Sequence, residues 1–182
     1  FLKGISAQLE KMQWMITTLL KISKFDAGTA VLHKEPVELA AVVEQALAPF
    51  IIQAELRQMT LAVDCHQGQF LGDRLWTVEA VQNIVKNCLE HMDNGGTLRL
   101  TGTQTALYCQ LVIADDGCGI EKEDLPHIFE RFYKGKNAGP DSVGIGLALS
   151  KSVLNRENAT VEVQSTVGVG TTFTIRFYRN II

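Results

Sequence analysis

The chain has 182 residues, which suffices for one domain with a full hydrophobic core and an additional segment but not for a second full domain. Hydrophobic residues make up 46% of the chain and charged residues 20%, and this composition excludes general disorder. The net charge of −3 offers no basic field for a nucleic acid, and the 4 cysteines form no C-x-x-C pair of the kind that zinc knuckles and thioredoxin-like sites use.

Residues 1–26 are predicted to form one helix, since they contain no proline and only one glycine, Gly4, near the start. Their apolar side chains recur in alternating steps of three and four, as in the seam of a coiled coil or a helical bundle. This seam consists of Leu2, Ile5, Leu9, Met12, Ile16 and Leu19. Such a stripe needs a partner helix, and the alternative is a core helix of the domain itself. Gly28 suits a helix C-cap and opens a polar connector over residues 28–36.

Two further helices and a strand are predicted in the next part of the chain. The spacing of apolar residues favours a helix over residues 37–56, with an irregularity at Pro49, and residues 59–63 have strand character. Asp73 is well placed as the N-cap of a third helix that runs to about Met92.

This third helix has a polar face. At about 100° per residue, Asn83, Asn87 and Glu90 fall opposite a stripe of apolar side chains. Asparagine has poor helix propensity, so two asparagines stacked one turn apart indicate a function, with a solvated polar face as the alternative.

The last part of the chain alternates strand and turn signals around one long loop and one helix. The elements expected are, in chain order, strands at residues 97–103 and 107–114, a charged and glycine-rich loop at 121–143 with a helical turn near residues 128 and 129, a helix at 144–155, and strands at 160–164 and 171–177. We therefore expect an α+β fold, a two-layer α/β sandwich in which a mixed, mostly antiparallel five-stranded sheet has three helices on one face.

One acidic residue, Asp115, ends an apolar strand and is followed by Gly117 and Gly119. A carboxylate at a buried strand end needs a cation or a ligand N–H group, and the glycines allow a sharp turn close to a ligand. Gly144 and Gly146 open a later helix, whose free N–H groups favour a phosphate. By itself the D-x-G-x-G pattern is weak, because Asp-Gly pairs also occur in simple turns.

Taken in order, these segments resemble the motifs of the ATP-binding catalytic domain of sensor histidine kinases, in the gyrase and Hsp90 (GHKL, or Bergerat-fold) superfamily. The asparagine box is similar to residues 82–88, the first glycine box to 115–120, the phenylalanine box to 128–134, the second glycine box to 143–149 and the last glycine box to 168–173. The resemblance implies an ATP- and Mg²⁺-dependent protein-histidine kinase of two-component signal transduction. Such an enzyme transfers the γ-phosphoryl group of ATP to a histidine, for onward transfer to an aspartate of a response regulator receiver domain.

The resemblance also implies roles for single residues. Asp115 would accept a hydrogen bond from the adenine amine, with Thr171 completing that polar corner. Asn87 would hold Mg²⁺ through its amide oxygen, with Asn83 beside the phosphates or the same ion. Lys134 joins these two asparagines as the implied catalytic residues.

The loop at 121–143 would be the ATP lid, from which Arg131 and Lys134 reach the phosphates, and Gly144 and Gly146 would let it fold over them. The other nucleotide-binding residues implied by the resemblance are His91, Gly117, Gly119, Ile120, Tyr133 and Leu147. ATP binding is expected to depend only on residues from about 70 onward.

Residues 1–27 resemble the second helix of the family's dimerisation hairpin, and residues 37–182 the catalytic domain. None of the 4 histidines has the context of the phosphorylated histidine on the first hairpin helix, so we expect a truncated chain that binds ATP but lacks its own acceptor. The intact protein is expected to be a homodimer through the hairpin, with a cytoplasmic catalytic domain and reduced cysteines. No apolar run here approaches the roughly 18 to 20 residues that cross a bilayer. The resemblance implies membrane anchorage of the intact protein upstream of residue 1.

Some positions depart from the family's pattern. Glu90 stands where a lysine or arginine is common, His91 where a tyrosine often lies against adenine, and Ser142 where a glycine is usual. Glu90 is the best argument for the alternative of a nucleotide-binding scaffold without phosphotransfer. A gyrase- or Hsp90-like hydrolase is a further alternative, but those enzymes place a glutamate base where this chain has Asn83, whose amide cannot take a proton from water.

Overall fold

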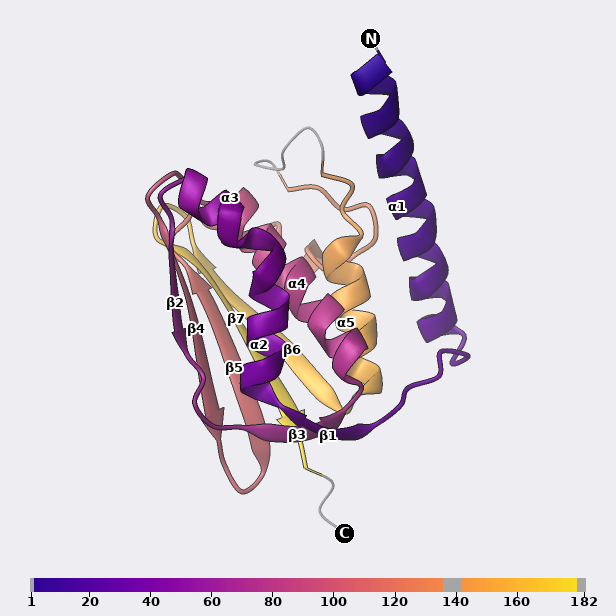
Figure 1. Cartoon of the computed structure of the whole chain (residues 1–182), viewed down its shortest axis with the longest axis vertical. Coiled ribbons are helices and arrows are strands. Elements are labelled where there is room, and N and C mark those ends of the chain that lie inside the picture. Colours follow the sequence, from indigo (N-terminus) through magenta and orange to yellow (C-terminus); the bar gives the residue numbers. More distant parts are fainter. Residues whose placement is uncertain (1, 136–141, 180–182) are drawn as a thin grey trace.

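The computed structural model describes residues 2–135 and 142–179, which form two layers (Figure 1). One layer is a five-stranded sheet in the order β2-β4-β5-β7-β6, in which β2 is parallel to β4 and the other neighbouring pairs are antiparallel. Its strands are β2 (Thr60–Asp64), β4 (Thr97–Gln104), β5 (Tyr108–Asp115), β6 (Ala159–Thr166) and β7 (Gly170–Tyr178). The mixed, mostly antiparallel sheet predicted from the sequence is therefore confirmed.

The second layer consists of helices on one face of this sheet (Figure 1). They are α2 (Leu39–Leu47), the short η1 (Ala48–Phe50), α3 (Ile51–Leu56), α4 (Arg74–Glu90) and α5 (Gly146–Arg156). Pro49 falls in η1, so the irregularity predicted there is confirmed. The predicted N-cap is confirmed as well, because the Asp73 carboxylate accepts hydrogen bonds from the backbone N–H groups of Leu75 and Trp76 at 3.1 and 3.3 Å.

The core lies between these layers. Strands β5 and β7 alternate buried and partly exposed side chains, as strands do when only one face is covered. Leu111 and Ile113 from β5 and Phe173 from β7 are 0% exposed, and they share one hydrophobic cluster with Ile84 and Val85 of α4. The buried face of α4 fixes the direction of its polar face.

Helix α1 (Leu2–Asp26) lies beside α5, at the edge of the helical layer (Figure 1). Its C-terminal half belongs to the core, because Ile22 and Phe25 are 0% and 3% exposed. The Phe25 ring packs edge-on against the Trp76 ring of α4, with centroids 4.8 Å apart. Lys21 Nζ also donates a hydrogen bond to Glu79 Oε1 of α4 at 2.6 Å. These contacts fix the position of α1 against the domain.

The seam predicted on α1 is exposed over most of its length. Four of its members are between 45% and 61% exposed: Ile5, Leu9, Met12 and Ile16. Leu19 is an exception, because it packs against the core while the neighbouring Leu20 is 60% exposed. The side chain of Leu2 lies outside those that the structure describes. Helix α1 is therefore a core helix at one end, and at the other end it carries an apolar stripe that is exposed among the described residues.

A second, two-stranded sheet is absent from the sequence-based prediction. Strand β1 (Glu35–Glu38) pairs antiparallel with β3 (Gln69–Gly72). The predicted helix start at Val37 is wrong, because this buried residue lies in β1. Helix α2 begins at Leu39, whose N–H donates to the Gly68 carbonyl oxygen at 2.8 Å. Each strand has only 4 residues, which is too few for a period of two to be recognised.

One segment, Leu39–Leu56, is long and apolar enough to cross a membrane by length and composition alone, with a mean hydropathy of 1.4. The sequence-based expectation that no apolar run approaches this length is therefore wrong. The segment is divided into α2, η1 and α3, and the buried side chains of α2 belong to the core. A core helix passes the same test, so this single segment is weak evidence for a membrane span.

Candidate functional site

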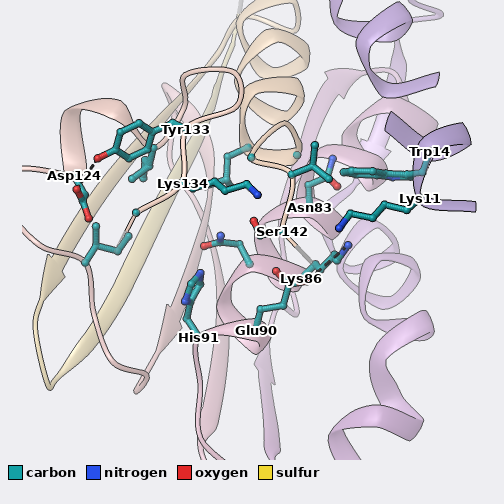
Figure 2. Close-up of a pocket in the computed structure, with 18 of the residues that line it drawn as sticks. Lys11, Trp14, Asn83, Lys86, Glu90, His91, Asp124, Tyr133, Lys134 and Ser142 are labelled. Atoms are coloured by element: carbon teal, nitrogen blue, oxygen red, sulfur yellow. Dashed lines mark hydrogen bonds and ion pairs between the residues drawn. The ribbon is translucent and has the colours of Figure 1, made fainter. Parts of the chain in front are cut away.

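A cavity of about 520 Å³ lies between the C-terminal half of α4, the start of α5, the loop after β5 and helix α1 (Figure 2). This volume is in the usual range of small-molecule sites. Most site residues predicted from the sequence line the cavity, namely Asn83, Asn87, His91, Gly119, Ile120, Tyr133, Lys134, Gly144, Gly146 and Leu147. The predicted residues that do not line it are Asp115, Gly117, Arg131 and Thr171.

Helix α4 contributes its polar face to the cavity. Because the apolar side chains of α4 are buried in the core, helical spacing turns Asn83 and Asn87 toward the open space. Within the part of the chain that the structure describes, neither amide makes a hydrogen bond to another residue. Glu90 Oε1, one turn further on, lies 3.7 Å from Lys86 Nζ. Two amide oxygens and a carboxylate therefore line one side of the cavity.

Asp115 stands at the end of β5, directly opposite Thr171 of β7. Its Oδ1 accepts hydrogen bonds from the backbone N–H groups of Gly117 at 2.9 Å and Thr171 at 3.2 Å. Burial raises the pKa of the neighbouring Cys88 thiol well above its usual range, and the Asp115 carboxylate raises it further. The thiol therefore stays protonated beside the carboxylate. The structure brings Asp115 and Thr171 together, and their contact with adenine remains a prediction.

Two glycines hold the loops around the cavity in close contact. Gly119 has φ +76°, and a Cβ there would lie 2.3 Å from the Thr166 carbonyl oxygen. Gly144 has φ +75°, and a Cβ there would lie 2.3 Å from the Tyr133 carbonyl oxygen. Since both positions combine a left-handed backbone with a neighbouring main chain, only glycine fits them without strain.

The predicted lid is described up to residue 135 and again from residue 142, and residues 136–141 lie outside the described residues. At its base, the Tyr133 hydroxyl donates to Asp124 Oδ1 at 2.5 Å, and this hydrogen bond raises the pKa of the tyrosine. Lys134 lines the cavity. Arg131 does not, because its guanidinium forms an ion pair with Asp26 at the end of α1. The structure thus places Arg131 at the contact between lid and α1 rather than in the cavity.

Sequence reasoning missed the contribution of α1. Its first half lines the cavity through Ala7, Gln8, Glu10, Lys11 and Trp14. ATP binding is expected from the sequence to depend only on residues from about 70 onward, and the cavity has a wall that lies outside this range. The contact joins segments about 70 residues apart, so no local pattern could reveal it.

The donor atoms around the cavity can be tested against Mg²⁺. Among residues 2–135 and 142–179, no cluster of three or more histidine, cysteine or acidic side chains could enclose a metal ion. Mg²⁺ is usually held by few protein oxygens and by substrate phosphates. The amide oxygens of Asn83 and Asn87, with the Glu90 carboxylate one turn on, are hard oxygen donors of this kind. The residues present therefore fit an ion shared with a polyphosphate.

Comparison with known proteins agrees with this geometry. Residues 72–181 match the model of the family "Histidine kinase-, DNA gyrase B-, and HSP90-like ATPase". The chain is 26% identical over 179 residues to the sensor-like histidine kinase SenX3 of Mycolicibacterium smegmatis. This match covers 96% of this chain and 47% of that protein. It is 32% identical over 170 residues to the signal transduction histidine-protein kinase/phosphatase MprB of Mycolicibacterium vanbaalenii. This match covers 92% of this chain and 34% of that protein.

Solved structures show the same architecture. A mycobacterial sensor histidine kinase MprB superposes with a TM-score of 0.73 at 25% identity, covering 79% of this chain and 97% of that chain. The histidine kinase AdeS of Acinetobacter baumannii superposes with a TM-score of 0.84, covering 98% of this chain and 84% of that chain; at 22% identity this likeness concerns the fold alone.

The fold and the family match together define an α+β domain of the ATPase type. This chain belongs to the histidine kinase-, DNA gyrase B- and HSP90-like ATPase family, and within it to the ATP-binding catalytic domains of sensor histidine kinases. It spans less than half the length of the curated relatives named above.

Proposed function

We propose that this domain binds ATP together with Mg²⁺ and transfers the γ-phosphoryl group to a histidine of a partner helix. One observation carries the proposal: a single cavity joins the asparagine face of α4, the N-terminus of α5 and Lys134. Hard oxygen donors, backbone N–H groups and a cation around one space suit a polyphosphate. Catalysis there would rest on positioning and charge neutralisation, because phosphoryl transfer asks little covalent chemistry of the protein.

Each side chain has a separate task in this proposal. Asp115 accepts a hydrogen bond from the adenine amine, at the corner that it shares with Thr171. Asn87 would hold Mg²⁺ and Asn83 would lie beside the phosphates, where such an ion would supply neutralisation of phosphate charge. Lys134 contacts the phosphates from the lid.

We further propose that residues 1–27 form the second helix of a dimerisation hairpin. The exposed stripe from Ile5 to Ile16 supports this, because apolar side chains at coiled-coil spacing are stabilised by a partner helix. The intact protein would then be a homodimer whose phosphorylated histidine passes its phosphoryl group to a response regulator receiver domain. Its catalytic domain would lie in the cytoplasm, with membrane anchorage supplied by segments outside this sequence.

Phosphotransfer to a separately supplied hairpin tests the proposal. The chain is incubated with Mg²⁺, ATP labelled in its γ-phosphate and a hairpin that bears the acceptor histidine. We expect acid-labile label on the hairpin and none on the chain, with Asn87→Ala as the inactive control. Release of inorganic phosphate without labelled hairpin would indicate a hydrolase, and ATP binding without either product would indicate a scaffold. Stoichiometric label on one of the chain's own histidines would contradict the assignment of α1; these are His33, His66, His91 and His127.

A further inference from the structure

Helix α1 forms a wall of the cavity in a position that its own packing determines. Ile22 and Phe25 are buried in the core, and Lys21 is bonded to Glu79, so the C-terminal half of the helix cannot move without breaking these contacts. The helix then continues as one unbroken segment to the cavity, where Lys11 and Trp14 line the open space. Their presence there is a consequence of core packing rather than of a loose terminal segment.

A cluster of charged and aromatic groups occupies this end of the cavity. Lys86 Nζ of α4 lies 5.1 Å from the centroid of the Trp14 ring and 3.7 Å from Glu90 Oε1. Figure 2 shows the side chains of Lys11 and Lys86 reaching from opposite walls toward the same region, away from Asp124 and Tyr133. Lys86 is paired with Glu90, and the Lys11 ammonium group beside it adds a second cation that can donate to a phosphate oxygen at this end of the cavity.

The cavity residues are arranged in a fixed order. His91, the C-cap of α4, lies next to the loop after Asp115, because its carbonyl oxygen accepts a hydrogen bond from the Cys118 N–H at 3.1 Å. Asn87 and Asn83 lie about one and two turns earlier on the helix, on the part of α4 that meets Trp14 of α1 through Lys86. A nucleotide with its base at the Asp115 corner would therefore extend its phosphates along the asparagines. The last group along this path, beyond Asn83, is the pair Lys11 and Trp14.

We propose that Lys11 of α1 binds the terminal phosphate of ATP, so that α1 is part of the nucleotide site and favours the triphosphate over the diphosphate. This inference rests on the proposed function. It assigns Trp14 a positioning role, because its ring lies against Lys86 and thereby fixes the space into which the terminal phosphate fits. The domain would then bind ATP with full affinity only when α1 is docked.

Separate titrations with ADP and ATP, both with Mg²⁺, test the inference. Lys11→Met should weaken ATP binding about tenfold, equivalent to about 1.4 kcal/mol, and change ADP binding less than twofold. Lys24→Met is the matched control, since Lys24 is an exposed lysine of the same helix outside the cavity, and it should leave both affinities unchanged. Lys11→Arg, which keeps the charge, should retain the preference for ATP.

Two results would overturn the inference. If Lys11→Met leaves both affinities unchanged, α1 contributes nothing to the site. If it weakens ADP and ATP equally, Lys11 supports the cavity in general and does not recognise the terminal phosphate. A wild-type chain that binds neither nucleotide would refute the proposed function itself, and circular dichroism of each variant separates loss of binding from loss of fold.

Discussion

Both ends of helix α4 carry polar groups. These groups are joined by hydrogen bonds at one end and make none to the described residues at the other. Near its N-terminus, Asp73, Thr77 and Glu157 are at most 6% exposed and are joined by hydrogen bonds. Near its C-terminus, the amides of Asn83 and Asn87 face the cavity without a hydrogen bond to any described residue. Buried polar groups stabilise a fold only when they are paired, whereas unpaired groups beside a cavity remain available to a ligand. The N-terminal end of α4 therefore contributes polar contacts to stability, and its C-terminal half offers polar groups to a ligand.

Hydrogen-bond accounting places a proton on Glu157. The Asp73 N–H donates to Glu157 Oε1 at 2.8 Å, and Thr77 Oγ1 lies 2.9 Å from the Asp73 carbonyl oxygen and 2.7 Å from Glu157 Oε2. A hydroxyl has one proton, so both contacts of Thr77 are hydrogen bonds only when Glu157 is neutral and donates one. In agreement, burial raises the pKa of Glu157 to about 7. The Asp73 carboxylate also raises this pKa, while the hydrogen bonds with Thr77 and the Asp73 N–H and the charge of Lys34 lower it.

The largest expected effect concerns this buried end. Because Glu157 has a pKa of about 7 when folded but the ordinary carboxyl pKa of about 4.5 when unfolded, the folded chain binds more protons between these pH values. Its contribution to stability is full below pH 4.5 and is lost as the pH rises through 7, a fall of roughly 3 kcal/mol. Glu157→Gln should remove this fall, since the amide can accept from the Asp73 N–H and donate to Thr77. Urea unfolding at pH 5 and pH 8 measures it.

The control for this comparison is Glu55→Gln, which changes an exposed carboxylate of α3 and should keep the wild-type dependence on pH. A Glu157→Gln variant that loses as much stability between pH 5 and pH 8 as the wild type would show that no proton is held at this end of α4.

A second effect concerns Asp115, which lies with Thr171 beside the C-terminal end of α4. Asp115→Asn should weaken ATP binding by about 1.5 to 3 kcal/mol, or roughly ten- to a hundredfold, because a charge-assisted hydrogen bond is replaced by a neutral one. Isothermal titration measures the change. The neighbouring Asp116→Asn is a matched control, since its carboxylate accepts from the Thr97 N–H and lies outside the cavity. An unchanged dissociation constant for Asp115→Asn would remove that residue from the site.

The smallest expected effect on stability concerns the open end. Asn87→Ala should change the free energy of unfolding by no more than about 0.5 kcal/mol, since the side chain makes no hydrogen bond within the described residues. It should nevertheless abolish the increase in ATP affinity that Mg²⁺ gives the wild type. Circular dichroism and titrations with and without Mg²⁺ measure both quantities. Unfolding of this variant would mean that the open end serves stability after all, and the contrast between the two ends would disappear.

Local patterns predicted the parts of the molecule that repeat over many residues. Helix α4 spans Arg74–Glu90, long enough for its asparagine face and its N-cap to be recognised, and β4, β5, β6 and β7 are strands of at least 8 residues. The short pair β1 and β3 was missed because 4 residues carry no periodicity. The seam of α1 was misplaced at Leu19, because which face of the helix packs on the domain depends on Trp76 and α5, far away in sequence.

Three features of the molecule could not be predicted for the same reason. The wall formed by Lys11 and Trp14, the ion pair between Arg131 and Asp26, and the buried Glu157 all arise from contacts between distant segments. Each residue type is ordinary in its local context. Only tertiary packing gives it a neighbour that alters its chemistry.

The docking of α1 also has a mechanical consequence. With a rise of about 1.5 Å per residue, Lys11 lies about 16 Å along the helix from the buried Ile22. A tilt of roughly 10° about that fixed point would carry Lys11 sideways by about 3 Å, which is the length of a hydrogen bond. The helix therefore acts as a lever arm, and a small rotation imposed on its exposed stripe is enough to make or break a contact inside the cavity.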